Sequence, residues 1–273
     1  MKAIRKIYGN SSAGQVHMRV LDAKEAAADG ANRPLVCLHA APYSGLYFST
    51  VMPLLNAART VIAPDYPGYG GSDPVPNGAP DIADYARATL ESLASLGFDP
   101  PYDVLGFHTG CLVGVEMRRL ASDSIEHLLL CDVPYFNAET QAELRIKMGK
   151  ALPVTAELSS LSAAWDFDVS SRLEAAGLDR SLALFVEHLR AAPDDHLAFV
   201  AAFSYDCVTR FAELAGRTTV IATESGLKEA SKTAAAAIVG ATLVTADDIQ
   251  GAVFEAGARR IAQYINDSLD GGG

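Results

Sequence analysis

One short stretch, residues 103–116, most constrains what this chain can fold into. It reads DVLGFHTGCLVGVE, which is an apolar run, a turn with glycines at positions 106 and 110, and an apolar pattern with helical spacing. This order predicts a buried strand over 103–107, a sharp turn centred on His108 and a helix over 109–121. Such a turn strains the backbone of its central residue and projects that side chain beyond the end of the strand.

Strands and helices alternate on both sides of this stretch. The run Leu35-Val36-Cys37-Leu38 is apolar throughout, as is typical of a strand buried on both faces of a parallel sheet. Apolar spacing predicts further strands over 3–8, 15–22, 60–63, 125–131, 218–222 and 241–244, the first two forming a hairpin. Helices are predicted over 45–57, 81–96, 227–237 and 252–269. The pattern favours an α/β fold with a mostly parallel, twisted sheet of about eight strands flanked by helices.

The alternation stops between residues 135 and 205. This segment shows helical periodicity in short pieces, interrupted at Pro153, at 166–168, at Gly177 and at Pro193, and it shows no strand pattern. We therefore predict a helical insertion over 135–205 in a core formed by 1–134 and 206–270. Residues 271–273 are all glycine, which predicts a flexible tail.

The charge balance and the cysteines limit the classes of partner. The 273 residues carry a formal net charge of −11, whereas nucleic-acid binding depends on clustered Lys and Arg. No run of about 18 apolar residues is present, and the first ten residues lack the apolar segment of a secretory signal. The four cysteines have no metal-ligand spacing. We expect a cytoplasmic protein with no metal, cofactor, nucleic-acid or membrane partner. Whether the protein forms a homodimer is left open.

Three motifs follow one another along the alternating strands. They are His39-Ala40-Ala41-Pro42, the loop DYPGYGGSD over 65–73, and GFHTG over 106–110. Together they resemble the α/β-hydrolase superfamily, in particular its cap-bearing branch of dehalogenases, epoxide hydrolases, C–C bond hydrolases and small esterases. The resemblance implies the α/β-hydrolase fold, a nucleophile elbow at 106–110 and a cap formed by 135–205 over the pocket.

The residues at the triad positions depart from the family pattern. His108 stands where the elbow normally carries the nucleophilic Ser. Aligning residues 254–257 with the family's last helix places Gln250 where the catalytic His would fall, and Gln is not a base near neutral pH. The acid position aligns with Gly226, with Glu224 two residues away. The resemblance therefore implies a degenerate Ser-Asp-His triad.

His108 has two candidate carboxylate partners. A carboxylate that accepts a hydrogen bond from one ring nitrogen would set the tautomer and leave the other nitrogen free as a base. Asp132 ends the strand next to the elbow strand and is our first choice. Asp248 lies on the loop that carries Gln250 and is our second choice.

The remaining site residues follow from the same resemblance. The backbone N–H groups of Ala41 and Thr109 would form the oxyanion hole, since this role needs no particular side chain. We expect His39 to hydrogen-bond the oxyanion loop. The hydroxyl groups of Tyr43 and Tyr135 are further pocket candidates.

These residues support several functions. The first is hydrolysis of a small, mostly apolar ester, lactone or β-dicarbonyl compound, with His108 as a general base on water or as a nucleophile through an acyl-imidazole. The second is a catalytically retired hydrolase that binds a hydrophobic small molecule. The third is a cofactor-free lyase or oxygenase in which His108 deprotonates a carbon acid. A purely structural role for His108 is the remaining alternative.

Overall fold

Eight strands form one sheet in the order β1-β2-β4-β3-β5-β6-β7-β8 in a computed structural model that describes residues 3–24, 33–55, 57–74 and 78–271. The strands are β1 (Arg5–Ser11), β2 (Gly14–Leu21), β3 (Leu35–Leu38), β4 (Val61–Pro64), β5 (Tyr102–Phe107), β6 (Ile125–Cys131), β7 (Arg217–Thr223) and β8 (Thr242–Ala246). β1 and β2 form the predicted antiparallel hairpin, and β2 is antiparallel to β4. The six strands β4, β3, β5, β6, β7 and β8 are parallel to one another. The predicted α/β sheet is confirmed.

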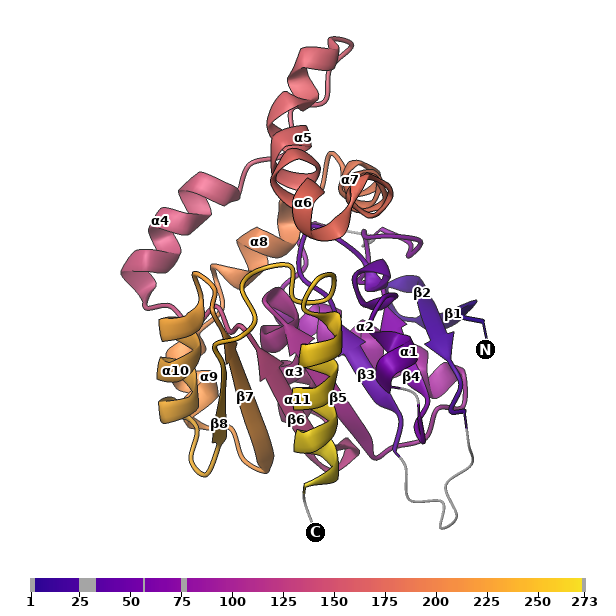
Figure 1. Ribbon diagram of the computed structural model, residues 1–273, viewed down its shortest axis with the longest axis vertical. Helices are drawn as coiled ribbons and strands as arrows, with labels where there is room; N and C mark the ends of the chain where they lie inside the picture. The colour runs from indigo at the N-terminus through magenta and orange to yellow at the C-terminus, as the bar shows by residue number, and fades with distance from the viewer. Residues whose placement is uncertain (1–2, 25–32, 56, 75–77, 272–273) are drawn as a thin grey trace.

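Helices cover both faces of this sheet (Figure 1). One face carries α2 (Ile82–Ser95), α3 (Thr109–Leu120) and α10 (Lys228–Ala237), and the other carries α1 (Met52–Leu55) and α11 (Ala258–Asp270). Every residue of β3, β4 and β5 is buried, because side chains on both sides of these central strands pack under helices. Burial of this apolar surface is the main driving force for forming the sheet.

Two predicted helices are shorter than their sequence pattern indicates. In place of the helix predicted over 45–57, the described residues of this range form a 3₁₀ turn, η1 (Gly45–Phe48), and the single turn α1. Pro53 lies in the first turn of α1, where a missing N–H is tolerated. The last helix begins at Ala258 and not at residue 252, because the N–H groups of Glu255 and Gly257 both donate to the Ala252 carbonyl and close a turn. This turn brings residues 250–253 and Glu255 to the pocket described below.

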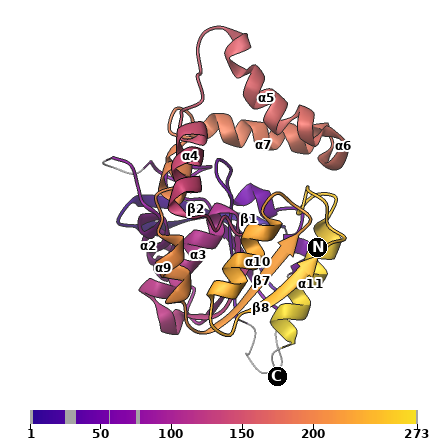
Figure 2. The same cartoon turned by 90° about the vertical axis from the view of Figure 1, so that its left-hand side faces the viewer.

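A helical insertion connects β6 to β7. It contains α4 (Ala138–Met148), η3 (Leu158–Leu161), α5 (Ser162–Asp168), η4 (Ser170–Arg172), α6 (Leu173–Ala176), α7 (Leu178–Ala191), α8 (Leu197–Ala202) and α9 (Cys207–Ala212). Figures 1 and 2 show α5, α6 and α7 beyond the carboxyl ends of the parallel strands, whereas α9 lies beside α10 on the core. We refer to residues 135–205 as the cap; this domain boundary stays a prediction.

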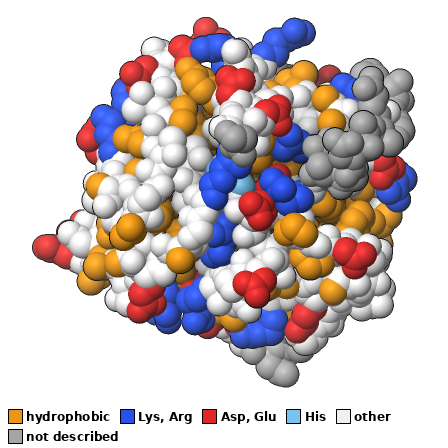
Figure 3. Space-filling model, turned by 90° about the horizontal axis from the view of Figure 1, so that it is seen from below, with side chains coloured by type: hydrophobic (Ala, Val, Ile, Leu, Met, Phe, Trp, Pro, Cys, Tyr) orange, Lys and Arg blue, Asp and Glu red, His pale blue; other side chains and the backbone are white. Residues whose placement is uncertain are grey.

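The face opposite the cap carries charged side chains of both signs. Figure 3 shows Lys and Arg side chains interspersed with Asp and Glu side chains on this face. Arg59 forms ion pairs with Asp103 and Asp270, and Arg33 forms one with Asp103. Within the described residues, no helix has the length and apolar character needed to cross a membrane.

Candidate active site

His108 occupies a strained turn between β5 and α3. Its backbone has φ 50° and ψ −117°, a positive φ that a residue with a side chain rarely adopts. The N–H of His108 donates to the Cys131 carbonyl of the neighbouring strand at 3.2 Å, which holds the turn against the sheet. The geometry expected for a nucleophile elbow is therefore present with an imidazole at its tip.

The two glycines of the turn are required by space. A Cβ atom on Gly106 would lie 2.5 Å from the Gly110 carbonyl oxygen, and one on Gly110 would lie 2.0 Å from the Leu38 carbonyl oxygen. Cys111 packs beneath the turn, where its buried thiol contacts the carbonyl oxygens of Gly106 and Cys131. Burial raises the pKa of this thiol well above its usual value, so it is a packing group rather than a nucleophile.

The loop after β3 carries Ala41, one of the two predicted oxyanion donors, and His39. His39 is fully buried; its Nδ1–H donates to the Ala40 carbonyl, and its Nε2 accepts from the N–H of Tyr66. These bonds fix a neutral tautomer, and burial lowers the pKa of His39 to about 4. The N–H groups of Ala41 and of Thr109, the first residue of α3, donate to no acceptor in the described part of the chain. Both residues are buried, and neither is among those that line the pocket described below.

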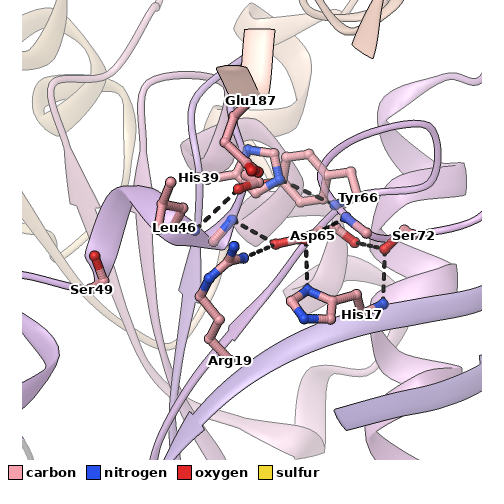
Figure 4. Close-up of polar contacts among 12 residues, drawn as sticks. His17, Arg19, His39, Leu46, Ser49, Asp65, Tyr66, Ser72 and Glu187 are labelled. Atoms are coloured by element: carbon pink, nitrogen blue, oxygen red, sulfur yellow. Dashed lines mark hydrogen bonds and ion pairs between the residues drawn. The ribbon is translucent and has the colours of Figure 1, made fainter. Parts of the chain in front are cut away.

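A buried carboxylate organises the loop over 65–73 behind this segment. Asp65 accepts hydrogen bonds from His17 Nδ1 at 2.7 Å and Arg19 Nη1 at 3.0 Å (Figure 4). The backbone N–H groups of Gly45 and Gly71 donate to the same carboxylate at 2.8 and 2.9 Å. Although burial opposes ionisation, these donors and cations hold the pKa of Asp65 below its usual value. Asp65 therefore ties the loop to β2 and to η1.

A pocket of about 380 Å³ lies between the elbow, the cap and the loop before α11. The core contributes the aromatic rings of Tyr47 and Phe107. The other lining residues are His108, Asp132, Phe167, Ser171, Arg172, Ala175, Ala176, Ser225, Gln250, Gly251, Ala252, Val253 and Glu255. The pocket brings together three of the predicted site residues, His108, Asp132 and Gln250.

His108 is an uncharged base in this pocket. Desolvation, and secondarily the positive charge of Arg172, lower the pKa of its imidazole to about 4. Its ring lies 4.0 Å from the Phe107 ring, centroid to centroid, and neither ring nitrogen has a hydrogen-bond partner among the described residues. The imidazole is therefore neutral around pH 7, with its nitrogens free to contact a ligand.

The predicted pair between His108 and Asp132 is not formed. Asp132 is fully buried, and its carboxylate accepts from the Thr223 N–H at 2.9 Å and from the Thr223 hydroxyl at 2.6 Å. Its backbone is itself strained, with φ 52°. Burial raises the pKa of Asp132. Because both carboxylate oxygens are turned toward Thr223, Asp132 connects β6 to β7 and does not orient the imidazole.

The other predicted polar partners lie away from His108. Asp248 is exposed and bonds to Arg260 and to Tyr264, so the alternative pair with His108 is not formed either. Glu224 is exposed and pairs with Lys228. Gln250 lines the pocket with an exposed side chain. In the described part of the chain, His108 therefore has no carboxylate partner.

The two predicted tyrosines have different positions. Tyr43 is buried next to the pocket; its hydroxyl donates to Asp168 at 2.5 Å and accepts from Arg172 at 2.8 Å. Tyr135 is half-buried and packs edge-on against Phe211, and it is not among the residues that line the pocket. Tyr43 contributes to the site through Arg172, whereas Tyr135 supports the base of the cap.

Arg172 is the functional residue that sequence reasoning missed. It ends η4 in the cap and lines the pocket together with His108. No pattern around position 172 marks this arginine among the other charged residues of the cap, because packing of the cap on the core brings it to the pocket. No group of three or more His, Cys, Asp or Glu side chains within the described ranges could hold a metal ion.

Comparison with known proteins identifies the family of the chain. The sequence model of the alpha/beta hydrolase family matches residues 35–273. A fluoroacetate dehalogenase from Burkholderia sp. is 33% identical over 109 residues, which cover 38% of this chain and 35% of that protein. A soluble epoxide hydrolase from Corynebacterium sp. (strain C12) is 34% identical over 104 residues, covering 38% of this chain and 36% of that protein. These matches thus span about a third of each relative.

A solved structure extends the likeness of fold to nearly the whole chain. A hydrolase from Pseudomonas aeruginosa PA01 superposes with a TM-score of 0.76 over 98% of this chain and 99% of that one, at 22% identity. The family match covers the elbow, the insertion and the loop before the last helix. The chain belongs to the alpha/beta hydrolase family.

Proposed function

We propose that the protein hydrolyses a small ester, lactone or activated carbonyl compound and that His108 is the general base. The observation that supports this most directly is the strained backbone of His108, which places an imidazole without a hydrogen-bond partner among the described residues in the pocket. A strained non-glycine residue is costly and is concentrated at functional sites. The aromatic lining of the pocket favours a largely apolar substrate.

The proposed reaction needs no covalent intermediate. The neutral imidazole of His108 takes a proton from a water molecule as the water oxygen attacks the carbonyl carbon. The negative oxygen of the resulting tetrahedral intermediate accepts hydrogen bonds from the N–H groups of Ala41 and Thr109. Collapse of the intermediate expels the alkoxide, which takes the proton back from the imidazolium. Attack by the imidazole itself, through an acyl-imidazole, is the alternative route on the same atoms.

Substitution of His108 tests this proposal. We expect His108→Ala and His108→Gln to lower kcat/KM on a responsive ester or lactone by about 100-fold or more, because a positioned general base contributes about 10²–10⁴. Tyr135→Phe is the matched control, since Tyr135 lies outside the pocket. Turnover that persists in both His108 variants, or no turnover on a broad panel of esters, lactones and diketones, would rule out the proposal.

The pH profile provides a second readout of the same group. Since the base must be uncharged, kcat/KM should rise as the pH increases through about 4, the pKa of His108, and stay flat from about 6 to 8. Arg172→Gln should move this rise to higher pH, because it removes the cation that disfavours the imidazolium. A rise centred near the ordinary histidine value of about 6.5 would contradict this assignment.

A second candidate function, binding without turnover, is favoured by one observation. No carboxylate among the described residues orients the imidazole, and a base with a pKa near 4 accepts protons weakly. A catalytically retired hydrolase that holds a small molecule would show saturable binding without product. In that case His108→Ala would change affinity only.

A further inference from the structure

Arg172 carries a positive charge at the pocket without a direct counter-ion. Its Nη1 donates to the Tyr47 hydroxyl at 3.2 Å and its Nη2 to the Tyr43 hydroxyl at 2.8 Å, while its Nε has no hydrogen-bond partner. No Asp or Glu among the described residues forms an ion pair with this guanidinium. Partial removal of a charge from water costs free energy unless an opposite charge or hydrogen-bond acceptors replace the lost hydration.

Aromatic rings hold the guanidinium in place. Its central carbon lies 5.0 Å from the centre of the Tyr43 ring, 6.0 Å from that of Tyr47 and 5.7 Å from that of Phe167. Such contacts between a cation and aromatic faces are favourable, but they do not neutralise the charge. Tyr43 and Tyr47 come from the loop and 3₁₀ turn after β3, and Phe167 comes from α5 in the cap. The guanidinium is therefore fixed from both sides of the pocket.

The carboxylates nearest to Arg172 are engaged elsewhere. Asp168 contacts it only through Tyr43, and the second oxygen of Asp168 bonds to His188 at 2.6 Å. Glu255 also lines the pocket; its Oε1 accepts from Arg180 at 3.2 and 3.3 Å, and its buried Oε2 has no hydrogen-bond partner among the described residues. Both oxygens of Asp132 accept from Thr223. Within the described residues, Arg172 is thus the pocket's cation without a carboxylate of its own.

We infer that Arg172 binds the anionic group of the ligand, and that the protein's ligands are small carboxylates. This inference deepens the proposed function and rests on the same pocket. The planar guanidinium suits a carboxylate, with which it forms charge-assisted hydrogen bonds. The substrate class then narrows from a neutral apolar ester to a small ester or lactone that carries a carboxylate, short enough for about 380 Å³.

Two probes of the same shape and different charge test the inference in the unmodified protein. Butyrate and butyramide differ in charge and hardly in size, and neither contains an ester bond to be hydrolysed. By titration calorimetry at pH 7, we expect butyrate to bind at least about tenfold more tightly than butyramide. Added NaCl should weaken the binding of butyrate and leave that of butyramide unchanged.

Variants of Arg172 assign the effect to this side chain. Arg172→Gln should weaken butyrate binding by about tenfold or more and leave butyramide unaffected, whereas Arg172→Lys, which keeps the charge but loses the planar fork, should fall between. Arg190→Gln is the matched control, because Arg190 is an exposed cap arginine that pairs with Glu187 and does not line the pocket. Circular dichroism confirms that each variant is folded.

The outcomes separate this inference from the proposed hydrolysis. If folded Arg172→Gln binds butyrate as tightly as the unmodified protein, or if butyrate and butyramide bind equally, the inference is overturned, whatever the esters show. If butyrate binds through Arg172 but no ester, lactone or diketone is turned over, the inference stands and the proposed hydrolysis fails. If the Arg172 variant does not fold, the charge and salt comparisons in the unmodified protein decide.

Discussion

At the scale of single residues, the buried carboxylate of Asp65 shows how a loop behind the pocket is held. Four donors from three segments, including the side chains of Arg19 and His17, meet at its two oxygens (Figure 4). These contacts stabilise the loop only while both the carboxylate and its donors are present. Removal of one partner leaves the other buried without an opposite charge or a hydrogen bond.

Replacing Asp65 with Asn should lower the free energy of unfolding by about 3 kcal/mol, since Arg19 would lose its buried partner. Urea unfolding at pH 7 measures this, and Asp99→Asn, at an exposed position, is the control. The folded-state pKa of Asp65 lies below its unfolded value, so its contribution is present above about pH 4 and is lost as the pH falls through the folded-state pKa. Equal stability of the two variants would contradict this assignment.

At the scale of elements, the elbow connects β5 to α3, and the start of α3 packs against β3. Gly110, in the first turn of α3, lies so close to β3 that any side chain would meet the Leu38 carbonyl oxygen. The close approach lets the His108 N–H reach the Cys131 carbonyl while the imidazole faces the pocket. The position of the proposed base therefore depends on the packing of a helix against a strand.

Gly110→Ala should displace α3 from β3. A Cβ atom 2.0 Å from a backbone oxygen cannot be accommodated by a side-chain rotation, and overpacking of this kind costs about 3 kcal/mol of unfolding free energy. The same substitution at Gly226, where a Cβ meets no atom within 4 Å, is the control and should change stability little. Thermal unfolding compares the two. If Gly110→Ala were as stable as Gly226→Ala, the close contact would have to be absent in solution.

At the scale of the whole molecule, a buried cluster joins the cap to the core. His188 of α7 contacts Asp168 at 2.6 Å and Asp195 at 3.4 Å, and Asp168 accepts from Tyr43 of the core. The Tyr69 hydroxyl of the core donates to the Asp195 carbonyl. Although burial opposes its charge, the two carboxylates raise the pKa of His188 to about 9. The cap is thus held on the pocket by an imidazolium between two aspartates.

This cluster predicts a loss of stability at alkaline pH. The folded pKa of His188, about 9, exceeds its unfolded value of about 6.5, so its contribution is complete below about pH 6.5 and disappears as the pH rises through 9. The difference corresponds to about 3 kcal/mol. Urea unfolding at pH 7 should show His188→Gln to be less stable by about this amount, and the gap should close near pH 10. A gap independent of pH would show that His188 acts only by packing.

Most of the fold could be predicted from local sequence patterns, and the arrangement of the site could not. The strands are recognisable because buried parallel strands require continuous apolar runs such as Leu35–Leu38. The bounds of the last helix were wrong, because the turn that begins at Ala252 interrupts a pattern that continues into α11. The choice of Asp132 as partner for His108 was wrong as a contact, because Thr223, distant in sequence, takes both carboxylate oxygens.

The sequence by itself determined the family, the sheet and the strained turn at His108, because apolar periodicity and closely spaced glycines act over a few residues. Only the tertiary structure decided the electrostatics of that residue. Burial and the nearby charge of Arg172 lower the pKa of the imidazole. Packing of the cap also places the guanidinium of Arg172, which has no ion-pair partner among the described residues, at the pocket. These effects depend on distances between segments that are far apart in the chain, and packing of the cap on the core sets those distances.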